Sequence, residues 1–210
     1  MKKSGRYRTA HLIEDQSEPG FHGRALNDKL SITSAREMKK LSFPIIHIIG
    51  LPGAGKTTLG KKLSKKYGLP VFNIGTYRSK FPATEEGEAD AWVDLFRGLS
   101  RRKWWDCILE TTGLNCRERF LRNAFPFGRI VTVKLTAQRN VLYERIRKKK
   151  DREQGDEWLF SDDYKDKYEF TRKMFKYFKE ISAEIVIDTT NRSVQEVFKK
   201  VVSDLRVWIR

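Results

Sequence analysis

The chain has 210 residues, of which 39% are hydrophobic and 12% aromatic, so it is long and apolar enough to bury one hydrophobic core. Its 43 lysines and arginines against 27 acidic residues give a formal net charge of +16, which favours anionic ligands such as nucleotides, phosphorylated metabolites, nucleic acid or acidic proteins without choosing among them. The longest apolar run is too short to cross a bilayer, and no apolar stretch follows the basic N-terminus. The two cysteines suit neither a disulfide framework nor a zinc site. We therefore expect a cytoplasmic protein without a membrane partner.

Residues 1–42 are polar, contain Pro19-Gly20 and Gly23, and show no sustained apolar period, so we interpret them as an N-terminal arm. Within the arm, residues 6–38 read RYRTAHLIEDQSEPGFHGRALNDKLSITSAREM, which resembles the leader segment of some Fic-family proteins. The Fic catalytic motif H-P-F-x-x-G-N-G-R is absent, so the resemblance implies no adenylylation activity. Two interpretations stay open: a docking or regulatory segment that binds a protein partner, and a partly disordered tail.

From residue 43 to residue 210, short apolar runs alternate with longer amphipathic segments, a pattern typical of a parallel sheet with helices on both faces. The predicted strands are Ile45–Ile49, Val71–Ile74, Cys107–Glu110, Ile130–Leu135 and Glu184–Ile187. The predicted helices are Gly55–Tyr67, Glu88–Arg102, Cys116–Phe125, Gln138–Lys149, Asp162–Ile181 and Ser193–Trp208. We therefore expect one α/β domain of three layers with a five-stranded parallel sheet.

The stretch GLPGAGKTT, residues 50–58, stands directly after the first predicted strand and before a predicted helix, and it matches the phosphate-binding pattern G-x-x-x-x-G-K-[ST]. Glycines suit such a loop because the backbone must turn tightly and point its N–H groups at an anion. Lys56 supplies a mobile positive charge for the β- and γ-phosphates, and the Thr57 hydroxyl suits a Mg²⁺ ion. We expect ATP and Mg²⁺ to bind here. The predicted nucleotide-binding residues of the loop are Gly50, Pro52, Gly53, Ala54, Gly55, Lys56, Thr57 and Thr58.

Two candidate site residues follow the next two predicted strands. Arg78, with Tyr77 beside it, comes just after the second strand, and an arginine fork there suits a phosphate or carboxylate of an acceptor, although a solvated surface arginine explains it equally well. Glu110 ends the third strand, where parallel α/β folds bind ligands. We predict that Glu110 either helps to hold Mg²⁺ or accepts the proton of the acceptor, and the residues alone do not choose between these roles.

The fourth predicted helix loses its period near Lys149 and continues as a polar stretch that contains Gly155. We interpret residues 148–161 as a lid over the nucleotide. Arg145 and Arg147 are the candidates for neutralising charge on the transferred phosphoryl group, against the alternative that they belong to a solvated helix end.

These stretches together resemble the P-loop small-molecule kinases, the group that includes shikimate, gluconate, adenylate and zeta-toxin-type kinases. The local likeness to the kinase half of 6-phosphofructo-2-kinase lies in the loop itself, in FNIGTYRS (residues 72–79), in ILETTGLNCRER (108–119) and, more weakly, in IDTTNRS (187–193). The resemblance implies the strand order 2-3-1-4-5 and a contact between adenine and the loop that contains Asn191. Glu110 in place of the family's aspartate, and Ser79 in place of a second arginine, argue against fructose 6-phosphate as the substrate.

The sequence thus predicts an ATP-dependent phosphotransferase that acts on a hydroxyl of a small acceptor, anionic if Arg78 binds it. Lys56, Glu110, Arg78, Arg145 and Arg147 are its predicted catalytic residues, and Thr57 and Glu110 its metal ligands. A polynucleotide-end kinase is an alternative, because a net charge of +16 favours nucleic acid. A nucleotide-dependent regulatory or switch protein acting through its arm is another. The sequence makes no prediction of the oligomeric state.

Overall fold

The computed structural model describes residues 42–115, 122, 129–150 and 166–209. The predicted N-terminal arm, except Ser42, therefore lies outside the described residues, as do most of the predicted helix Cys116–Phe125 and most of the predicted lid. Within the described part of the chain, no helix has the length and apolar character needed to cross a membrane.

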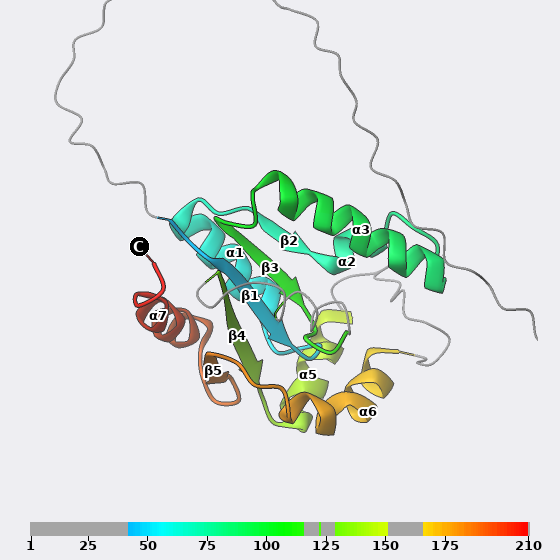
Figure 1. Cartoon of the computed structure of the whole chain (residues 1–210). Helices are drawn as coiled ribbons and strands as arrows, with labels where there is room; N and C mark the ends of the chain where they lie inside the picture. The colour runs from blue at the N-terminus through cyan, green and yellow to red at the C-terminus, as the bar shows by residue number, and fades with distance from the viewer. Residues whose placement is uncertain (1–41, 116–121, 123–128, 151–165, 210) are drawn as a thin grey trace, which may run out of the picture. The chain divides into compact units, whose positions relative to one another are not determined.

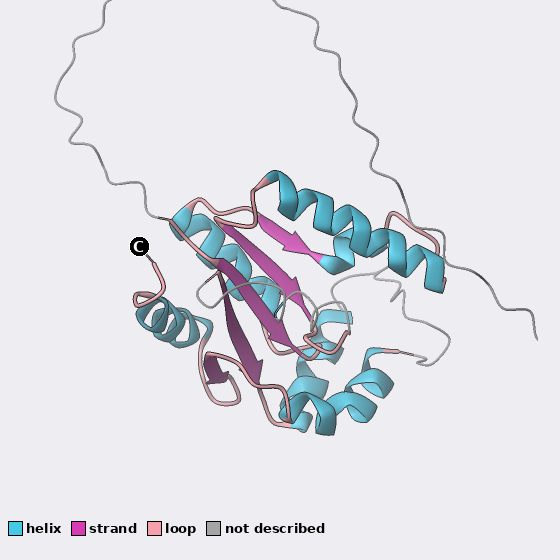
Figure 2. Cartoon of the chain, in the orientation of Figure 1, coloured by secondary structure: helices cyan, strands magenta, loops and turns pink. Residues whose placement is uncertain are grey.

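A five-stranded parallel sheet forms the centre of the domain (Figures 1 and 2). Its strands are β1 (Ile45–Gly50), β2 (Val71–Asn73), β3 (Cys107–Thr111), β4 (Ile130–Thr136) and β5 (Ile185–Asp188). Their order is β2-β3-β1-β4-β5, and every neighbouring pair is parallel, which confirms the predicted fold class and strand order. All carboxyl ends of the strands therefore meet at one edge of the sheet, where ligands bind in folds of this kind.

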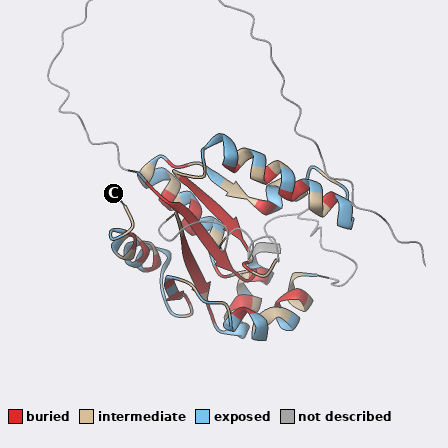
Figure 3. Ribbon diagram, viewed as in Figure 1, coloured by how far each residue is buried: buried red, intermediate tan, exposed pale blue. Residues whose placement is uncertain are grey.

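Two hydrophobic clusters cover the two faces of the sheet, because successive side chains of a strand point to opposite sides. Ile46 and Ile48 of β1 belong to the cluster that includes α1 (Lys56–Tyr67) and α7 (Val194–Leu205). Ile45 of β1 and Leu109 of β3 belong to the cluster that includes α2 (Ile74–Arg78) and α3 (Glu85–Arg101). The result is the predicted arrangement of three layers, with the buried strands in the middle (Figure 3).

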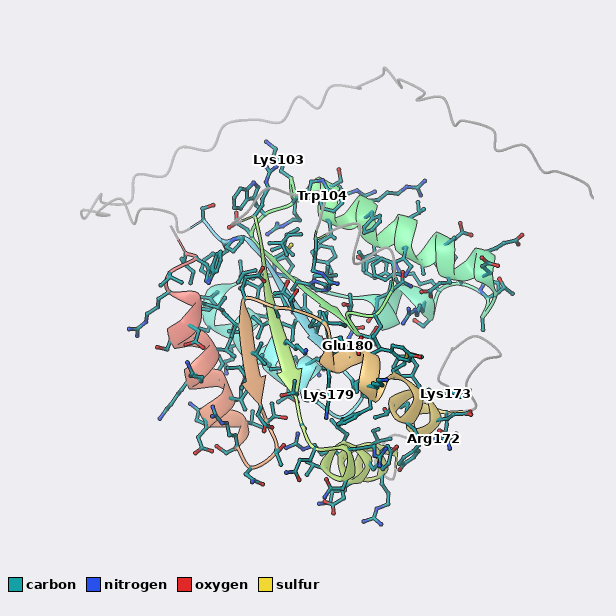
Figure 4. All side chains as sticks on the ribbon, turned by 60° about the horizontal axis from the view of Figure 1, so that its bottom comes forward. Lys103, Trp104, Arg172, Lys173, Lys179 and Glu180 are labelled. Atoms are coloured by element: carbon teal, nitrogen blue, oxygen red, sulfur yellow. The ribbon has the colours of Figure 1, made fainter. Side chains whose placement is uncertain are left out.

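Two further helices, α5 (Arg139–Lys150) and α6 (Lys167–Lys179), pack against each other near the end of β4 (Figure 1). The buried Lys134 of β4 fixes the end of α6, because its Nζ donates to the carbonyl oxygens of Lys179, at 3.0 Å, and Ile181, at 2.6 Å. Arg172 and Lys173 are exposed on the same helix, as is the Lys179 side chain (Figure 4). The net positive charge is therefore not confined to the N-terminal arm.

Several element boundaries differ from the predicted ones for local reasons. The second strand ends at Asn73, whose side chain accepts from the Gly75 amide and begins the short helix α2 where a strand end was predicted. Helix α3 begins about one turn before the predicted start, because the Thr84 side chain caps it by accepting from the Gly87 amide. Three acidic residues in its first turn also suit the positive end of a helix.

Candidate active site

The loop between β1 and α1 has the backbone shape predicted for a phosphate-binding turn. Gly53 and Gly55 adopt left-handed conformations, with φ of 80° and 97°. A β-carbon at Gly53 would lie 2.7 Å from the carbonyl oxygen of Leu142 on α5, so this glycine is required by close approach as well as by its φ angle. Gly50, Pro52 and Ala54 are all buried, and a β-carbon at Gly50 would lie 3.0 Å from that of Ala54.

The polar side chains of the loop lie at the start of α1. Lys56 is the first residue of the helix, and its Nζ lies 3.4 Å from the carbonyl oxygen of Leu51 within the loop. Thr57 and Thr58 follow in the first turn, and both are exposed. The residue before the helix is Gly55, which offers no side chain to cap the first amide groups. The loop therefore combines a cation with helix-start N–H groups, as an anionic ligand needs.

Thr57 and Glu110 meet between the loop and β3. The Thr57 hydroxyl donates to Glu110 Oε1 at 2.6 Å, and Glu110 is only 4% exposed. Among the residues that the structure describes, no group donates to the buried Glu110 Oε2. A buried carboxylate oxygen without a donor, next to a hydroxyl, is a donor set that suits a hard cation such as Mg²⁺.

The described residues contain no group of three or more histidine, cysteine, aspartate or glutamate side chains that is placed to hold a metal ion. A Mg²⁺ ion at this site would therefore have few protein ligands. That is the usual way in which proteins hold Mg²⁺ together with phosphates, because the ion keeps several waters and takes only one or two carboxylates. Thr57 and Glu110, the two predicted metal ligands, are brought together and fit the ion.

Arg145 of α5 lies against the other side of the loop. Its guanidinium donates to Thr189 Oγ1 at 2.9 Å and to the Thr189 carbonyl oxygen at 2.7 Å, and it lies 3.5 Å from the carbonyl oxygen of Gly53. Thr189 is buried, and its hydroxyl also contacts the carbonyl oxygen of Thr136, at 3.0 Å, where β4 ends. Arg145 thus connects the phosphate-binding loop to the segment that follows β5.

The other residues predicted on this side are exposed. Arg147 lies on the solvent side of α5, and the lid segment beyond Lys150 lies outside the described residues. Asn191 is exposed in the turn between β5 and α7. Asp188 begins that turn, and the pKa of its carboxyl is lowered because both the hydroxyl and the amide of Thr190 donate to it. The turn is therefore held by local hydrogen bonds beside Thr189.

Arg78, the arginine predicted to face an acceptor, forms a two-pronged ion pair with Glu88 of α3. Its Nε and Nη2 atoms each lie 2.6 Å from a different oxygen of the carboxylate. The same Glu88 accepts from Trp92 Nε1 at 2.8 Å and from Asn115 Nδ2 at 3.2 Å. Because Asn115 follows β3, this cluster lies beside the strand that carries Glu110.

Beneath the site, His47 of β1 is fully buried and its Nε2 lies 2.7 Å from Thr111 Oγ1. Burial, and to a smaller extent the positive charge of Arg122, lower the pKa of His47 to about 3. The imidazole is therefore neutral at neutral pH, and it is part of the buried core of the sheet.

Three polar residues of this region were not predicted from the sequence: Glu88, Asn115 and Thr189. Each has a partner on another element, and Thr189 lies 44 residues from Arg145. A weak signal existed for Glu88, because a glutamate and a tryptophan four residues apart share one helix face. Asn115 and Thr189 lie in the stretches 108–119 and 187–193 that carry the family resemblance, but nothing in those stretches singled them out.

Comparison with known proteins agrees with this geometry. A family model described as an AAA domain (AAA_18) matches residues 46–168, a range that begins in β1 and includes the phosphate-binding loop and Glu110. A shikimate kinase from Paracidovorax citrulli (strain AAC00-1) is 38% identical over 79 residues, which are 33% of this chain and 37% of that enzyme. The match thus spans little more than a third of the length of this curated relative.

Solved kinase structures share the fold. The shikimate kinase from Acinetobacter baumannii in complex with shikimate has a TM-score of 0.52 at 19% identity, over 77% of this chain and 92% of its own. A gluconokinase from Sinorhizobium meliloti 1021 has a TM-score of 0.51 at 16% identity, over 77% of this chain and 91% of its own. The fold is that of the P-loop small-molecule kinases, which confirms the predicted resemblance.

Proposed function

Because the chain belongs to the AAA domain family that matches residues 46–168, and has the fold of P-loop small-molecule kinases, we propose that it is a kinase that transfers the γ-phosphate of ATP to a hydroxyl of a small acceptor. The observation that carries the proposal is the hydrogen bond between Thr57 and Glu110. It joins the phosphate-binding loop to a buried carboxylate at the carboxyl end of the neighbouring strand, where a magnesium nucleotide needs its ligands.

Each residue of the loop then has a distinct part. The backbone N–H groups at the start of α1 bind phosphate oxygens, and Lys56 adds a positive charge that follows the β- and γ-phosphates. Thr57 and Glu110 would hold Mg²⁺. When bound, the magnesium nucleotide supplies an activated phosphoryl group, and the protein contributes position and charge neutralisation rather than a covalent intermediate.

On the acceptor side, the Glu110 carboxylate has a second proposed role. Its Oε2 atom is buried and accepts no hydrogen bond from the described residues, so it is available to take the proton of an acceptor hydroxyl when it is not bound to metal. Arg145 lies beside Gly53 and Thr189, so its positive charge is proposed to act on the nucleotide, together with the turn that contains Asn191. Arg147 and the segment 148–161 stay predictions as parts of a lid.

A screen for phosphate transfer tests the proposal. The full chain is incubated with Mg²⁺ and γ-labelled ATP against sugars, polyols, nucleosides, hydroxy acids and oligonucleotide ends, with Lys56→Ala as the matched control. We expect one class of acceptor to be labelled at a rate at least about a hundredfold above that of the Lys56→Ala variant, because the variant lacks the ammonium group that binds the phosphates. Nucleotide binding without transfer to any class would instead favour a regulatory nucleotide-binding protein.

An oligonucleotide end is included because the net charge of +16 and the exposed basic residues of α6 favour a polyanion. If it is the acceptor, its KM must rise steeply with salt, whereas the KM of a small uncharged acceptor changes little. A docking or regulatory role for residues 1–42, and a cytoplasmic location, complete the proposal. A chain that lacks residues 1–42 and keeps its full transfer rate would support separate roles for the arm and the kinase-like domain.

A further inference from the structure

Thr189 is a buried residue whose polar atoms all form hydrogen bonds within the described part of the chain. It follows β5 directly and is only 4% exposed. Its amide donates to the carbonyl oxygen of Thr136 at 2.8 Å, and its carbonyl oxygen accepts from Arg145 Nη2 at 2.7 Å. Its hydroxyl oxygen lies 2.9 Å from Arg145 Nη1 and 3.0 Å from the Thr136 carbonyl oxygen. This residue therefore joins the end of β4 to the middle of α5.

The hydroxyl of Thr189 can make these contacts at the same time, because it accepts through its lone pairs and donates its one proton. The guanidinium of Arg145 has donors only, so the hydroxyl accepts from Nη1. Its own proton goes to a carbonyl oxygen, either that of Thr136 at 3.0 Å or that of Ala54 in the phosphate-binding loop at 3.4 Å. An aliphatic side chain of the same shape could fill neither role.

These bonds determine where the guanidinium of Arg145 lies. Its contact with the Gly53 carbonyl oxygen is long, at 3.5 Å, whereas its two contacts with Thr189 are short. Thr189, rather than the loop, therefore holds the guanidinium in place. Among the described residues, Nε of Arg145 and the second hydrogen of Nη2 have no acceptor, so these two donors remain for a ligand.

The location of this network matches the proposed nucleotide site. Gly53 and Ala54 belong to the phosphate-binding loop, and Thr189 immediately precedes the turn that contains Asn191. A flexible arginine loses conformational entropy when it binds a phosphate. An arginine that is already held in one orientation loses less, and so contributes more to affinity.

We infer that Thr189 is a positioning residue of the nucleotide site. It holds the Arg145 guanidinium beside the phosphate-binding loop, so that the arginine binds the phosphate groups of the nucleotide in a fixed orientation. The inference rests on the proposed function, because it needs a nucleotide in the loop. It adds to that function a residue that acts through another side chain.

Calorimetric titration of the full chain with Mg²⁺ and a non-hydrolysable ATP analogue measures the effect. Thr189→Val keeps the shape of the side chain and removes the hydroxyl, so we expect affinity to fall by about tenfold, as for the loss of one hydrogen bond to a charged group. Thr189→Ser keeps the hydroxyl and stays within about twofold of the wild type. The matched control is Thr171→Val on α6, because Thr171 is fully buried and its hydroxyl has no partner among the described residues. We expect that control to change affinity by less than about twofold.

A double-mutant cycle separates positioning of Arg145 from support of the fold. Arg145→Met keeps the aliphatic stem and removes the guanidinium, and we expect it to lower affinity by about tenfold or more. In this background Thr189→Val should change affinity by less than about twofold, because no guanidinium is left to hold. A hydroxyl that only supported the loop or the end of β4 would give the same loss in both backgrounds. Urea unfolding of each variant is measured alongside, and Thr189→Ala repeats the cycle if the valine variant does not fold.

Three results would overturn the inference: an equal loss from Thr189→Val with and without the guanidinium, an unchanged affinity in Arg145→Met, or a Thr189→Ser variant that binds as weakly as Thr189→Val. A wild type that binds no nucleotide would overturn both the inference and the proposed function. Phosphate transfer from ATP is followed in parallel. If the cycle behaves as expected and no acceptor is labelled, the proposed function fails while the role of Thr189 is supported. If an acceptor is labelled and the cycle shows no coupling, the proposed function holds and the inference fails.

Discussion

The phosphate-binding loop, on the nucleotide side of the candidate site, and the Arg78 and Glu88 pair, on its proposed acceptor side, are built in different ways. On the nucleotide side, the shape of residues 50–58 comes from the backbone, with left-handed glycines and one close approach to α5. On the acceptor side, the shape comes from side chains, since Arg78, Glu88, Trp92 and Asn115 reach one another from α2, α3 and the segment after β3. The shape of the loop depends on positions where no side chain fits. The shape of the Arg78 and Glu88 pair depends on which side chains are present.

This difference has a consequence for how each side can change. The backbone of the loop binds phosphate groups, which all nucleotides share. Because its shape comes from the backbone, few substitutions in the loop preserve nucleotide binding. The Arg78 and Glu88 pair is held by its side-chain charges, and one substitution can remove such a charge without moving the backbone. We therefore expect substitutions in the loop to abolish nucleotide binding, and substitutions near Glu88 to leave nucleotide binding intact while they change stability or acceptor choice.

Gly53→Ala tests the nucleotide side and has the largest expected effect. The new β-carbon would lie 2.7 Å from the Leu142 carbonyl oxygen, at a φ of 80° that L residues rarely adopt. The loop must shift, so we expect nucleotide affinity, measured by calorimetric titration, to fall by about a hundredfold, or about 2.7 kcal/mol.

Gly68→Ala is the matched control for that change. Gly68 also has a positive φ, of 70°, but a β-carbon there would meet nothing within 4 Å. We expect it to cost about 1 kcal/mol of stability and no nucleotide affinity. Equal losses of affinity in both variants would show that the close approach at Gly53 has no special role.

The next prediction concerns the buried His47 of β1. It tests whether this residue affects the stability of the core and leaves nucleotide binding by the loop unchanged. The pKa of His47 is about 3 in the folded protein and near 6.5 when exposed, so between these values the unfolded chain binds a proton that the folded chain does not. Stability therefore falls as the pH drops below 6.5, by about 2 kcal/mol at pH 5. Urea unfolding at pH 7 and pH 5 measures this loss.

The variant His47→Gln removes the titrating group. Its loss of stability between pH 7 and pH 5 is expected to be smaller than that of the wild type by the same amount, with nucleotide affinity at pH 7 unchanged. An identical pH dependence in the two proteins would mean that His47 is not the group that titrates.

The contrast between the two sides also explains what the sequence could predict. Residues 50–58 are a local pattern of strand, turn and helix, so their shape follows from neighbours in the chain. The strand order 2-3-1-4-5 came from a family resemblance that the same pattern made recognisable. Both were confirmed, the loop because a short-range pattern determines its shape, and the strand order because that pattern identified the fold.

Such short-range signals could not predict the Arg78 and Glu88 pair. The helix was predicted to begin at Glu88, and its real start at Glu85 depends on the Thr84 cap. Arg78 was expected beyond a strand, whereas it ends the short helix α2. Only the packing of α2 against α3 brings the two side chains together, and this contact cannot be predicted from either segment alone.

Glu110→Gln sharpens the comparison at the boundary between the two sides. The amide keeps a hydrogen-bond acceptor for Thr57 and loses the negative charge that suits Mg²⁺. We expect ATP affinity in the presence of Mg²⁺ to fall by about tenfold, or about 1.4 kcal/mol, and affinity in excess chelator to stay within about twofold. A loss of the same size with and without Mg²⁺ would argue against Glu110 as a metal ligand.

Trp92→Phe tests the acceptor side and has the smallest expected effect. The phenyl ring keeps most of the buried contact with Phe96, whose ring centroid lies 5.7 Å from that of Trp92, but it removes the Nε1 donor to Glu88. Because Arg78 and Asn115 still donate to the carboxylate, we expect a cost of about 1 kcal/mol in urea unfolding. Nucleotide affinity should not change, since the loop is formed by its own backbone. A variant that loses nucleotide affinity would show that the two sides are coupled, and that the acceptor pair also supports the loop.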